Sequence, residues 1–184
     1  MADIEFAFAF IKPDGMASEL KDRIRGMLLA SGKLTILAEA KFSITPLQAK
    51  VHYDKDDLWC KSVGTRRHEF IARRFGGVSK TPMELGREIL SDVRGTIVGA
   101  PVYAFILYGE NANAVLREIV GATDPEAAEE GTIRKLSSDS LALANEEMRP
   151  VRNIIHASES PNDAKREILN LWPEIRQLMQ FLLF

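Results

Sequence analysis

Two residues, His156 and Glu167, have types and positions that could do acid–base or nucleophilic chemistry. His156 follows the apolar residues Val151, Ile154 and Ile155, at the point where a strand should give way to a loop. Glu167 falls on the apolar stripe of the following segment, which is periodic like a helix. A carboxylate there needs a donor, and a bond to His156 would fix the imidazole tautomer and leave the other nitrogen free to attack. Alternatively, His156 is a hydrogen-bonded core residue and Glu167 leans out to solvent.

Lys12 is a candidate anion-binding residue. It has the same parity along a predicted strand as the phenylalanines at positions 6, 8 and 10, so it stands at the end of a buried strand. A buried cation needs an anion. The alternatives are that Lys12 extends to the surface or pairs with Asp14.

A scattered polar set follows in the second half of the chain. Arginines make fork-shaped contacts to phosphate oxygens, and threonine and asparagine add neutral donors. The members of this set are Arg117, Thr123, Arg134 and Asn153. Walker-type, protein-kinase, dinucleotide-binding and zinc-protease motifs are all missing from the sequence, so a nucleotide enzyme would need another solution.

Composition limits the class of protein. The 184 residues are 46% hydrophobic, which suits one domain with a substantial core. With 24 basic and 26 acidic side chains, no chain-wide field attracts nucleic acid or anionic membranes. Cys60 is the only cysteine, which excludes an internal disulfide and favours a reducing compartment. No segment approaches the ~20 apolar residues of a spanning helix, so we expect a cytoplasmic protein without a membrane partner.

Periodicity and turn signals predict the elements that must position these residues. Strands are expected at 6–11, 34–44, 102–108 and 151–158. Helices are expected after the capping signals at Ser18, at Thr45 (to about Trp59), at Thr81 (to about Asp92) and at Ser160, and a further helix is expected from Asn111 to Val120. Residues 122–149 should be mostly loop. This order suggests a split β-α-β sheet with helices packed on one face, an α+β fold.

Residues 60–99 form a predicted insertion, because the apolar pattern weakens there. Between Lys61 and Lys80 there are six Lys or Arg residues against only Glu69. This basic stretch is interpreted as a solvated loop, with a phosphate or RNA contact as the alternative.

Three motifs, in order along the chain, resemble the signatures of nucleoside diphosphate kinases. They are Phe10-Ile11-Lys12-Pro13-Asp14-Gly15, Gly131-Thr132-Ile133-Arg134, and Arg152-Asn153-Ile154-Ile155-His156-Ala157-Ser158-Glu159. The resemblance covers residues 3–59 and 100–173. It implies a ferredoxin-like four-stranded antiparallel sheet with helices packed on it, in a single domain 1–184 with an insertion at about 60–99 and a C-terminal tail at about 174–184.

The resemblance also implies a ping-pong transfer of the terminal phosphate from a nucleoside triphosphate, typically ATP, to a nucleoside diphosphate, which maintains triphosphate pools. His156 would accept the phosphoryl group, with Glu167 and Ser158 orienting it. The nucleotide would be held by Lys12, Tyr53, Arg117, Thr123, Arg134 and Asn153. Trp59 is the favoured base-stacking aromatic, with Phe70 and Phe75 as alternatives. Mg²⁺ would be held mainly by the nucleotide phosphates, without a protein carboxylate cage.

Two departures from the family pattern stand beside His156: Ala157 replaces a glycine and Glu159 an aspartate. We expect Ala157 to keep a negative φ, with activity retained. A homo-oligomer is expected, as hexamer, tetramer or dimer. The competing interpretations are a catalytically silent nucleotide-sensing or interaction module, and a nucleic-acid-binding sheet. Retention of His156, Lys12 and Glu167 argues against the first, and the lack of aromatics on the polar face of strand 34–44 against the second.

Overall fold

The computed structural model describes residues 4–172 and residue 175, and its centre is an antiparallel sheet of four strands in the order β2-β3-β1-β4. The strands are β1 (Ile4–Ile11), β2 (Thr35–Ser43), β3 (Pro101–Glu110) and β4 (Ile155–Ala157). β1 pairs with β3 along its whole length and with β4 at its C-terminal end. The predicted ferredoxin-like α+β class is confirmed.

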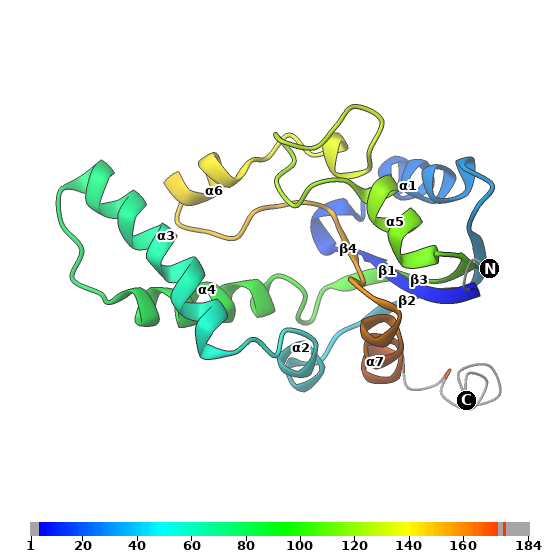
Figure 1. Cartoon of the computed structure of the whole chain (residues 1–184), viewed down its shortest axis with the longest axis horizontal. Helices are drawn as coiled ribbons and strands as arrows, with labels where there is room; N and C mark the ends of the chain where they lie inside the picture. Colours follow the sequence, from blue (N-terminus) through cyan, green and yellow to red (C-terminus); the bar gives the residue numbers. More distant parts are fainter. Residues whose placement is uncertain (1–3, 173–174, 176–184) are drawn as a thin grey trace.

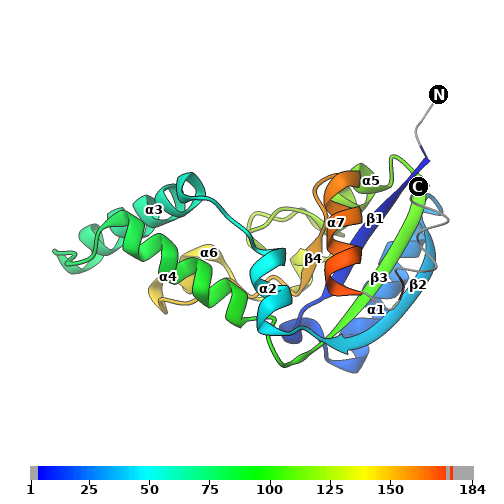
Figure 2. The same ribbon diagram turned by 90° about the horizontal axis from the view of Figure 1, so that it is seen from below.

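Helices cover both faces of the sheet, whereas packing on one face was expected. α1 (Ser18–Ala30) and α5 (Ala112–Val120) lie on one face, and α2 (Pro46–His52) and α7 (Pro161–Leu171) on the other (Figures 1 and 2). The reason is visible in β1, whose alanines face one hydrophobic cluster with Ile24 and Leu116, while Phe8 and Phe10 face a second cluster with Ile168. A strand that is apolar on both faces needs a cover on each.

The capping signals of three helices act as predicted, whereas Ser18 lies inside α1, whose N-cap is Ala17. Thr45 and Gln48 form a complete capping box at α2, as do Thr81 and Glu84 at α4 (Pro82–Gly95). The Ser160 hydroxyl accepts a hydrogen bond from the backbone N–H of Asp163 at the start of α7. Each cap satisfies a backbone donor that the first helical turn leaves unpaired.

The helix expected to run from Thr45 to about Trp59 is in fact two helices. α2 ends at His52, and α3 (Asp57–Phe75) begins after Asp56, whose carboxylate accepts from the backbone N–H of Trp59 at 2.8 Å. The prediction missed this second N-cap, which starts a new helix in a new direction.

α3 and α4 form a helical hairpin that extends away from the sheet (Figure 1). Most of the basic stretch between residues 61 and 80 therefore lies on a helix and not in a loop. Gly76, in the left-handed conformation at φ 80°, ends α3, and Gly64 and Gly86 lie where the two helices touch. A Cβ at Gly64 would lie 1.7 Å from the Pro82 carbonyl oxygen, so the close approach requires glycine.

β4 is shorter than the predicted strand 151–158, because Ile154 takes the left-handed conformation at φ 57° and interrupts the extended backbone. Ala157 pairs with Ala9 in an ordinary strand conformation, as expected. Residues 122–149 are mostly irregular, with a short η2 (Arg134–Leu136) and α6 (Leu141–Glu146).

Two further features complete the fold. η1 (Pro13–Gly15) follows β1 directly. Within the described part of the chain, every helix is too short or too polar to cross a membrane. The C-terminal tail predicted at about 174–184 lies outside the described residues, apart from Ile175.

Candidate active site

His156 lies on the edge strand β4, on the face of the sheet that α2 and α7 cover. It pairs with Phe10 of β1, and the two rings stack at 4.9 Å between centroids. The His52 ring, at the end of α2, meets it edge-on at 4.4 Å. The His156 side chain keeps 15% of its surface exposed, so the ring is held firmly by aromatic contacts yet remains reachable.

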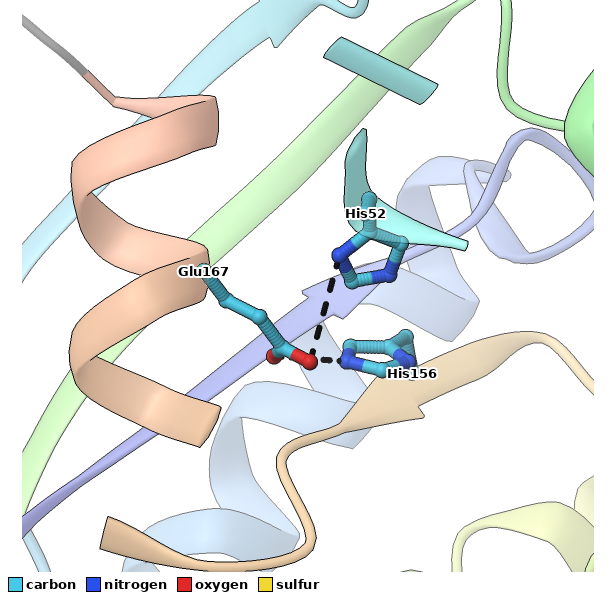
Figure 3. A group of neighbouring side chains, drawn as sticks. All are labelled: His52, His156 and Glu167. Atoms are coloured by element: carbon cyan, nitrogen blue, oxygen red, sulfur yellow. Dashed lines mark hydrogen bonds and ion pairs between the residues drawn. The ribbon is translucent and has the colours of Figure 1, made fainter. Parts of the chain in front are cut away.

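Glu167 is the hydrogen-bond partner of His156. Its Oε2 lies 2.8 Å from Nε2 of His156, and Figure 3 shows the two side chains meeting from α7 and β4. The helical stripe places Glu167 inside, where burial raises the pKa of its carboxyl to about 7. An ionised Glu167 accepts a hydrogen bond from Nε2–H, which leaves the lone pair on Nδ1.

The surroundings keep the His156 ring neutral. Burial, first of all, and then nearby cations lower its pKa well below the usual value. Those cations are Lys12, Arg134, Lys55 and Arg166. A neutral imidazole with a free lone pair is the form that can act as a nucleophile.

Lys12 belongs to a short chain of hydrogen bonds that reaches across three loops. Its Nζ donates to Oδ1 of Asn153 at 2.6 Å, and Nδ2 of Asn153 donates to the carbonyl of Thr123 at 3.0 Å. Burial lowers the pKa of Lys12 to about 8, with Asp14 opposing and Arg134 adding to the shift. The ammonium is therefore half-buried and still mostly charged at neutral pH.

Arg117 and Arg134 line the same pocket, next to the hydrogen bonds that join Lys12, Asn153 and Thr123. Arg134 donates from Nη1 to the carbonyl of Gly121 at 3.0 Å, and burial lowers its pKa to about 10, which keeps it charged. Arg117, Thr123 and Arg134 line one pocket of about 420 Å³, together with Ala157 and Glu159 next to His156. Two guanidinium groups, each a fork of donors, suit the oxygens of a phosphate chain.

The turn after β1 holds the residue before β4 in a strained conformation. Asp14 accepts a hydrogen bond from the backbone N–H of Ile154 at 2.9 Å, and the carbonyl of Ile154 accepts from the backbone N–H of Lys12 at 2.8 Å. A β-branched residue at φ 57° costs of order 1–3 kcal/mol, so these bonds must support it. The turn at residues 12–15 and the segment before His156 therefore stabilise each other's conformation.

Tyr53 lies where the site meets the α3–α4 hairpin. Its ring stands 6.4 Å from that of His156, and burial raises the pKa of its hydroxyl. The Tyr53 carbonyl, at the end of α2, accepts two hydrogen bonds from Arg94 of α4, at 2.8 and 3.2 Å. Sequence reasoning missed Arg94, because nothing in the sequence pairs a residue of α4 with the end of α2.

Two of the predicted site residues are placed differently from the rest. Ser158 is buried, accepts from the backbone N–H of Phe8 and donates to Oδ1 of Asn113 at 2.7 Å. Its only proton is therefore not available to His156 or Glu167. Trp59 lies in the first turn of α3, and the described ring contacts of His156 come from Phe10, His52 and Tyr53 instead.

His52 is a site residue that the sequence analysis passed over. It is 4% exposed and lies between Phe10, Tyr53 and His156. The sequence did place it next to the predicted site residue Tyr53, inside the helix expected from Thr45 to about Trp59. Burial and His156 lower its pKa to about 2, so its ring is neutral.

Comparison with known proteins gives one consistent answer. The family model described as nucleoside diphosphate kinase matches residues 84–176. A nucleoside diphosphate kinase of Pyrobaculum aerophilum is 33% identical over 171 residues, which cover 90% of this chain and 93% of the relative. One from Caulobacter vibrioides is 29% identical, with 92% and 95% covered.

Solved structures agree. The crystal structure of an NDP kinase from Pyrobaculum aerophilum matches with a TM-score of 0.80 at 32% identity and covers 92% of this chain and 96% of its own. A Borrelia burgdorferi nucleoside-diphosphate kinase, described as a transition state mimic with bound vanadate and ADP, matches at 0.70 and 25% identity, with 92% and 86% covered. This chain belongs to the nucleoside diphosphate kinase family of phosphotransferases.

Proposed function

We propose that this chain transfers the terminal phosphate of a nucleoside triphosphate to a nucleoside diphosphate by a ping-pong reaction through a phosphohistidine at His156. The observation that carries this proposal is the 2.8 Å bond between Nε2 of His156 and Glu167, because it leaves the Nδ1 lone pair free.

In the first half of the reaction, Nδ1 attacks the terminal phosphorus and the bond to the diphosphate oxygen breaks. The ring then carries Nδ1–P and Nε2–H and is positively charged, and the Glu167 carboxylate next to Nε2 stabilises that charge. The nucleoside diphosphate leaves, another binds, and the reverse steps return the phosphoryl group. One site serving both nucleotides accounts for the ping-pong order.

The cations around His156 have a separate task. Lys12, Arg117 and Arg134 would hold the phosphates and stabilise charge on the transferring group, while Thr123 and Asn153 add neutral contacts. Tyr53 would contact the phosphates, and Trp59 would stack on the base. Ser158 would act on His156 only through β1 and Asn113, since those are its hydrogen-bond partners.

Magnesium fits this site as a companion of the nucleotide. Among the described residues, the only group of three possible metal ligands contains two histidines and one carboxylate, which is not the oxygen-rich set that Mg²⁺ prefers. Mg²⁺ would thus be held by phosphate oxygens and water, where it screens their charge. The Borrelia burgdorferi relative described with vanadate and ADP supports a diphosphate and a phosphoryl mimic as ligands of this fold.

The wider setting follows the same proposal. The chain would act in the cytoplasm on nucleoside di- and triphosphates, maintain triphosphate pools and assemble as a homo-oligomer, without a membrane or nucleic-acid partner.

The test is transfer of label through the protein. Purified protein is incubated with terminally labelled ATP and Mg²⁺, quenched in alkali or chased with unlabelled GDP. His156→Gln is compared with His68→Gln, a matched control on the distant hairpin. We expect acid-labile label that moves to GDP in the wild type and the control, and none in His156→Gln. A folded wild-type protein that takes up no label would refute the proposal and favour the silent binding module.

A further inference from the structure

The His52 side chain is buried without a hydrogen bond to either ring nitrogen, within the part of the chain that the structure describes. A neutral imidazole has one N–H donor and one lone pair, and leaving both unpaired in the interior is unfavourable. The proposed transfer reaction gives His52 no task. An unpaired polar ring beside a nucleophile therefore calls for a ligand.

The neighbours of His52 supply the rest of a ligand set. Its Nδ1 lies 3.9 Å from Oε1 of Glu167, while Nε2 of His156 lies 2.8 Å from Oε2 of the same carboxylate. One donor atom from each of the three side chains lies within 4.8 Å of the other two. Figure 3 shows both rings directed at the Glu167 carboxylate.

We propose that His52, His156 and Glu167 form a binding site for a divalent transition metal such as Zn²⁺, and that the bound metal blocks phosphoryl transfer. Two imidazole nitrogens and one carboxylate oxygen are a common zinc donor set, with water as the fourth ligand. Bonds of about 2.0–2.1 Å place tetrahedral ligand atoms roughly 3.3 Å apart, so modest side-chain rotations close the site.

The site discriminates between metals by donor type. Mg²⁺ takes oxygen ligands and keeps its water, so it should not compete for two imidazoles. Neighbouring cations set the strength of binding: Arg166 lies 3.7 Å from Oε1 of Glu167, and Lys12 also acts on His156. We therefore expect weaker binding than at a structural zinc site.

The effect on transfer, which rests on the proposed function, comes from the position of one proton. Metal can bind Nε2 of His156 only after the Nε2 proton has left, and a neutral ring then carries its proton on Nδ1. That proton occupies the lone pair needed for attack on phosphorus. The metal also takes the Glu167 carboxylate, which would otherwise stabilise the phosphorylated ring.

Metal binding is tested without nucleotide or Mg²⁺, on untagged full-length protein, so its outcome does not depend on kinase activity. Co²⁺ is titrated and its visible absorption followed, and Zn²⁺ affinity is measured against a chromophoric chelator. We expect one metal per chain in the wild type and in His68→Gln. His52→Phe and Glu167→Gln should each bind at least tenfold more weakly, with folding checked by circular dichroism. If His52→Phe does not fold, Glu167→Gln decides.

Inhibition is tested on the same proteins with labelled ATP and excess Mg²⁺. One equivalent of Zn²⁺ beyond that bound by nucleotide should suppress labelling of the wild type and His68→Gln, and the ratio of labelling with and without Zn²⁺ should approach one in His52→Phe. A wild type that binds no metal, or variants that bind it as tightly as the wild type, would overturn the site. Metal binding without loss of labelling would overturn the block alone.

Discussion

At His156 a single hydrogen bond decides which ring nitrogen can react. Because Glu167 lies 2.8 Å from Nε2, its protonation state controls the tautomer of the ring. An ionised Glu167 accepts from Nε2–H and leaves Nδ1 free, whereas a protonated Glu167 donates to Nε2 and forces the ring proton onto Nδ1. The pair thus titrates as a unit.

The first prediction concerns pH. With the pKa of Glu167 raised to about 7 and that of His156 lowered, the wild-type rate of phosphorylation should rise as pH increases through about 7. Glu167→Gln cannot titrate, so its rise should move to lower pH, with a plateau about tenfold lower because the phosphorylated ring loses an ionic partner. The rate of label uptake is measured from pH 5 to 9, and substrate ionisation cancels in the comparison. Identical profiles for the two proteins would show that Glu167 does not control the ring.

At the scale of elements, η1 and the start of β4 depend on one another. A Cβ at Gly15 would meet the carbonyl oxygen of Ile154 at 2.7 Å and Cγ2 of Ile11 at 2.8 Å, and both groups belong to the site's framework. Ile154 already occupies a strained conformation and has little freedom to move.

Gly15→Ala should accordingly lower both stability and transfer. We expect a loss of about 1–3 kcal/mol in the free energy of unfolding, from overpacking against backbone, and slower phosphorylation as Ile154 moves His156. Gly26→Ala is the matched control, because its Cβ meets nothing within 4 Å on α1 and should stabilise by about 0.5–1 kcal/mol. Urea unfolding measures the stability of both variants, and uptake of label measures their rate of phosphorylation. Equal stability and activity in Gly15→Ala and wild type would contradict the role of this contact.

Arg94 connects the hairpin to the site. Arg94→Ala removes two charged hydrogen bonds from the Tyr53 carbonyl and should cost about 1.5–3 kcal/mol, with a higher KM for nucleotide as Tyr53 loosens. Arg87→Ala breaks an exposed pair with Asp57 at 3.4 Å and should change stability by less than about 0.5 kcal/mol. Denaturant titration and steady-state kinetics on both variants separate the two cases. Equal, small effects of the two substitutions would show that Arg94 does not support Tyr53.

Sequence patterns predicted the elements best where local signals were complete. The capping boxes at Thr45 and Thr81 and the apolar stripe of α7 each depend on residues a few positions apart. One error came from a tertiary constraint and another from a local cap that a continuous helical pattern concealed. β4 is short because Asp14, distant in sequence, holds Ile154 in the left-handed region, and the α2–α3 break depends on a cap at Asp56 that competes with a continuous helical pattern.

Across the whole molecule, stability should be unevenly distributed. The two hydrophobic clusters of the sheet contain no residue of α3 or α4, and these helices pack chiefly on one another. We expect amide protons of 57–95 to exchange through local opening, at a lower free energy than those of β1 and β3. Hydrogen exchange followed by mass spectrometry in rising denaturant measures this. Protection lost everywhere at the same denaturant concentration would show one cooperative unit.

The site residues could be predicted where a local motif carries them, and not where their contacts span the fold. Motif resemblance picked out Lys12, Asn153 and His156, and the chain brings them together as expected. It could not indicate that the Ser158 hydroxyl proton goes to Asn113, that Arg94 reaches Tyr53, or that the ring nitrogens of His52 have no hydrogen-bond partner in the described part of the chain. Those facts depend on which side chains meet across the fold, and local spacing does not carry them.

The contact between Arg94 and Tyr53 also has a consequence for how this chain can change in length. Residues 54–93 extend away from the sheet and return to Tyr53 at Arg94, and the Gly99 N–H separately donates to the carbonyl of Ile44. The entropic cost of closing such a segment grows only with the logarithm of its length, by about 0.6 kcal/mol for each doubling. Provided that its two ends and the first turn of α3 with Trp59 are kept, we expect the rest of this segment to tolerate changes in length while His156 and Glu167 stay where they are.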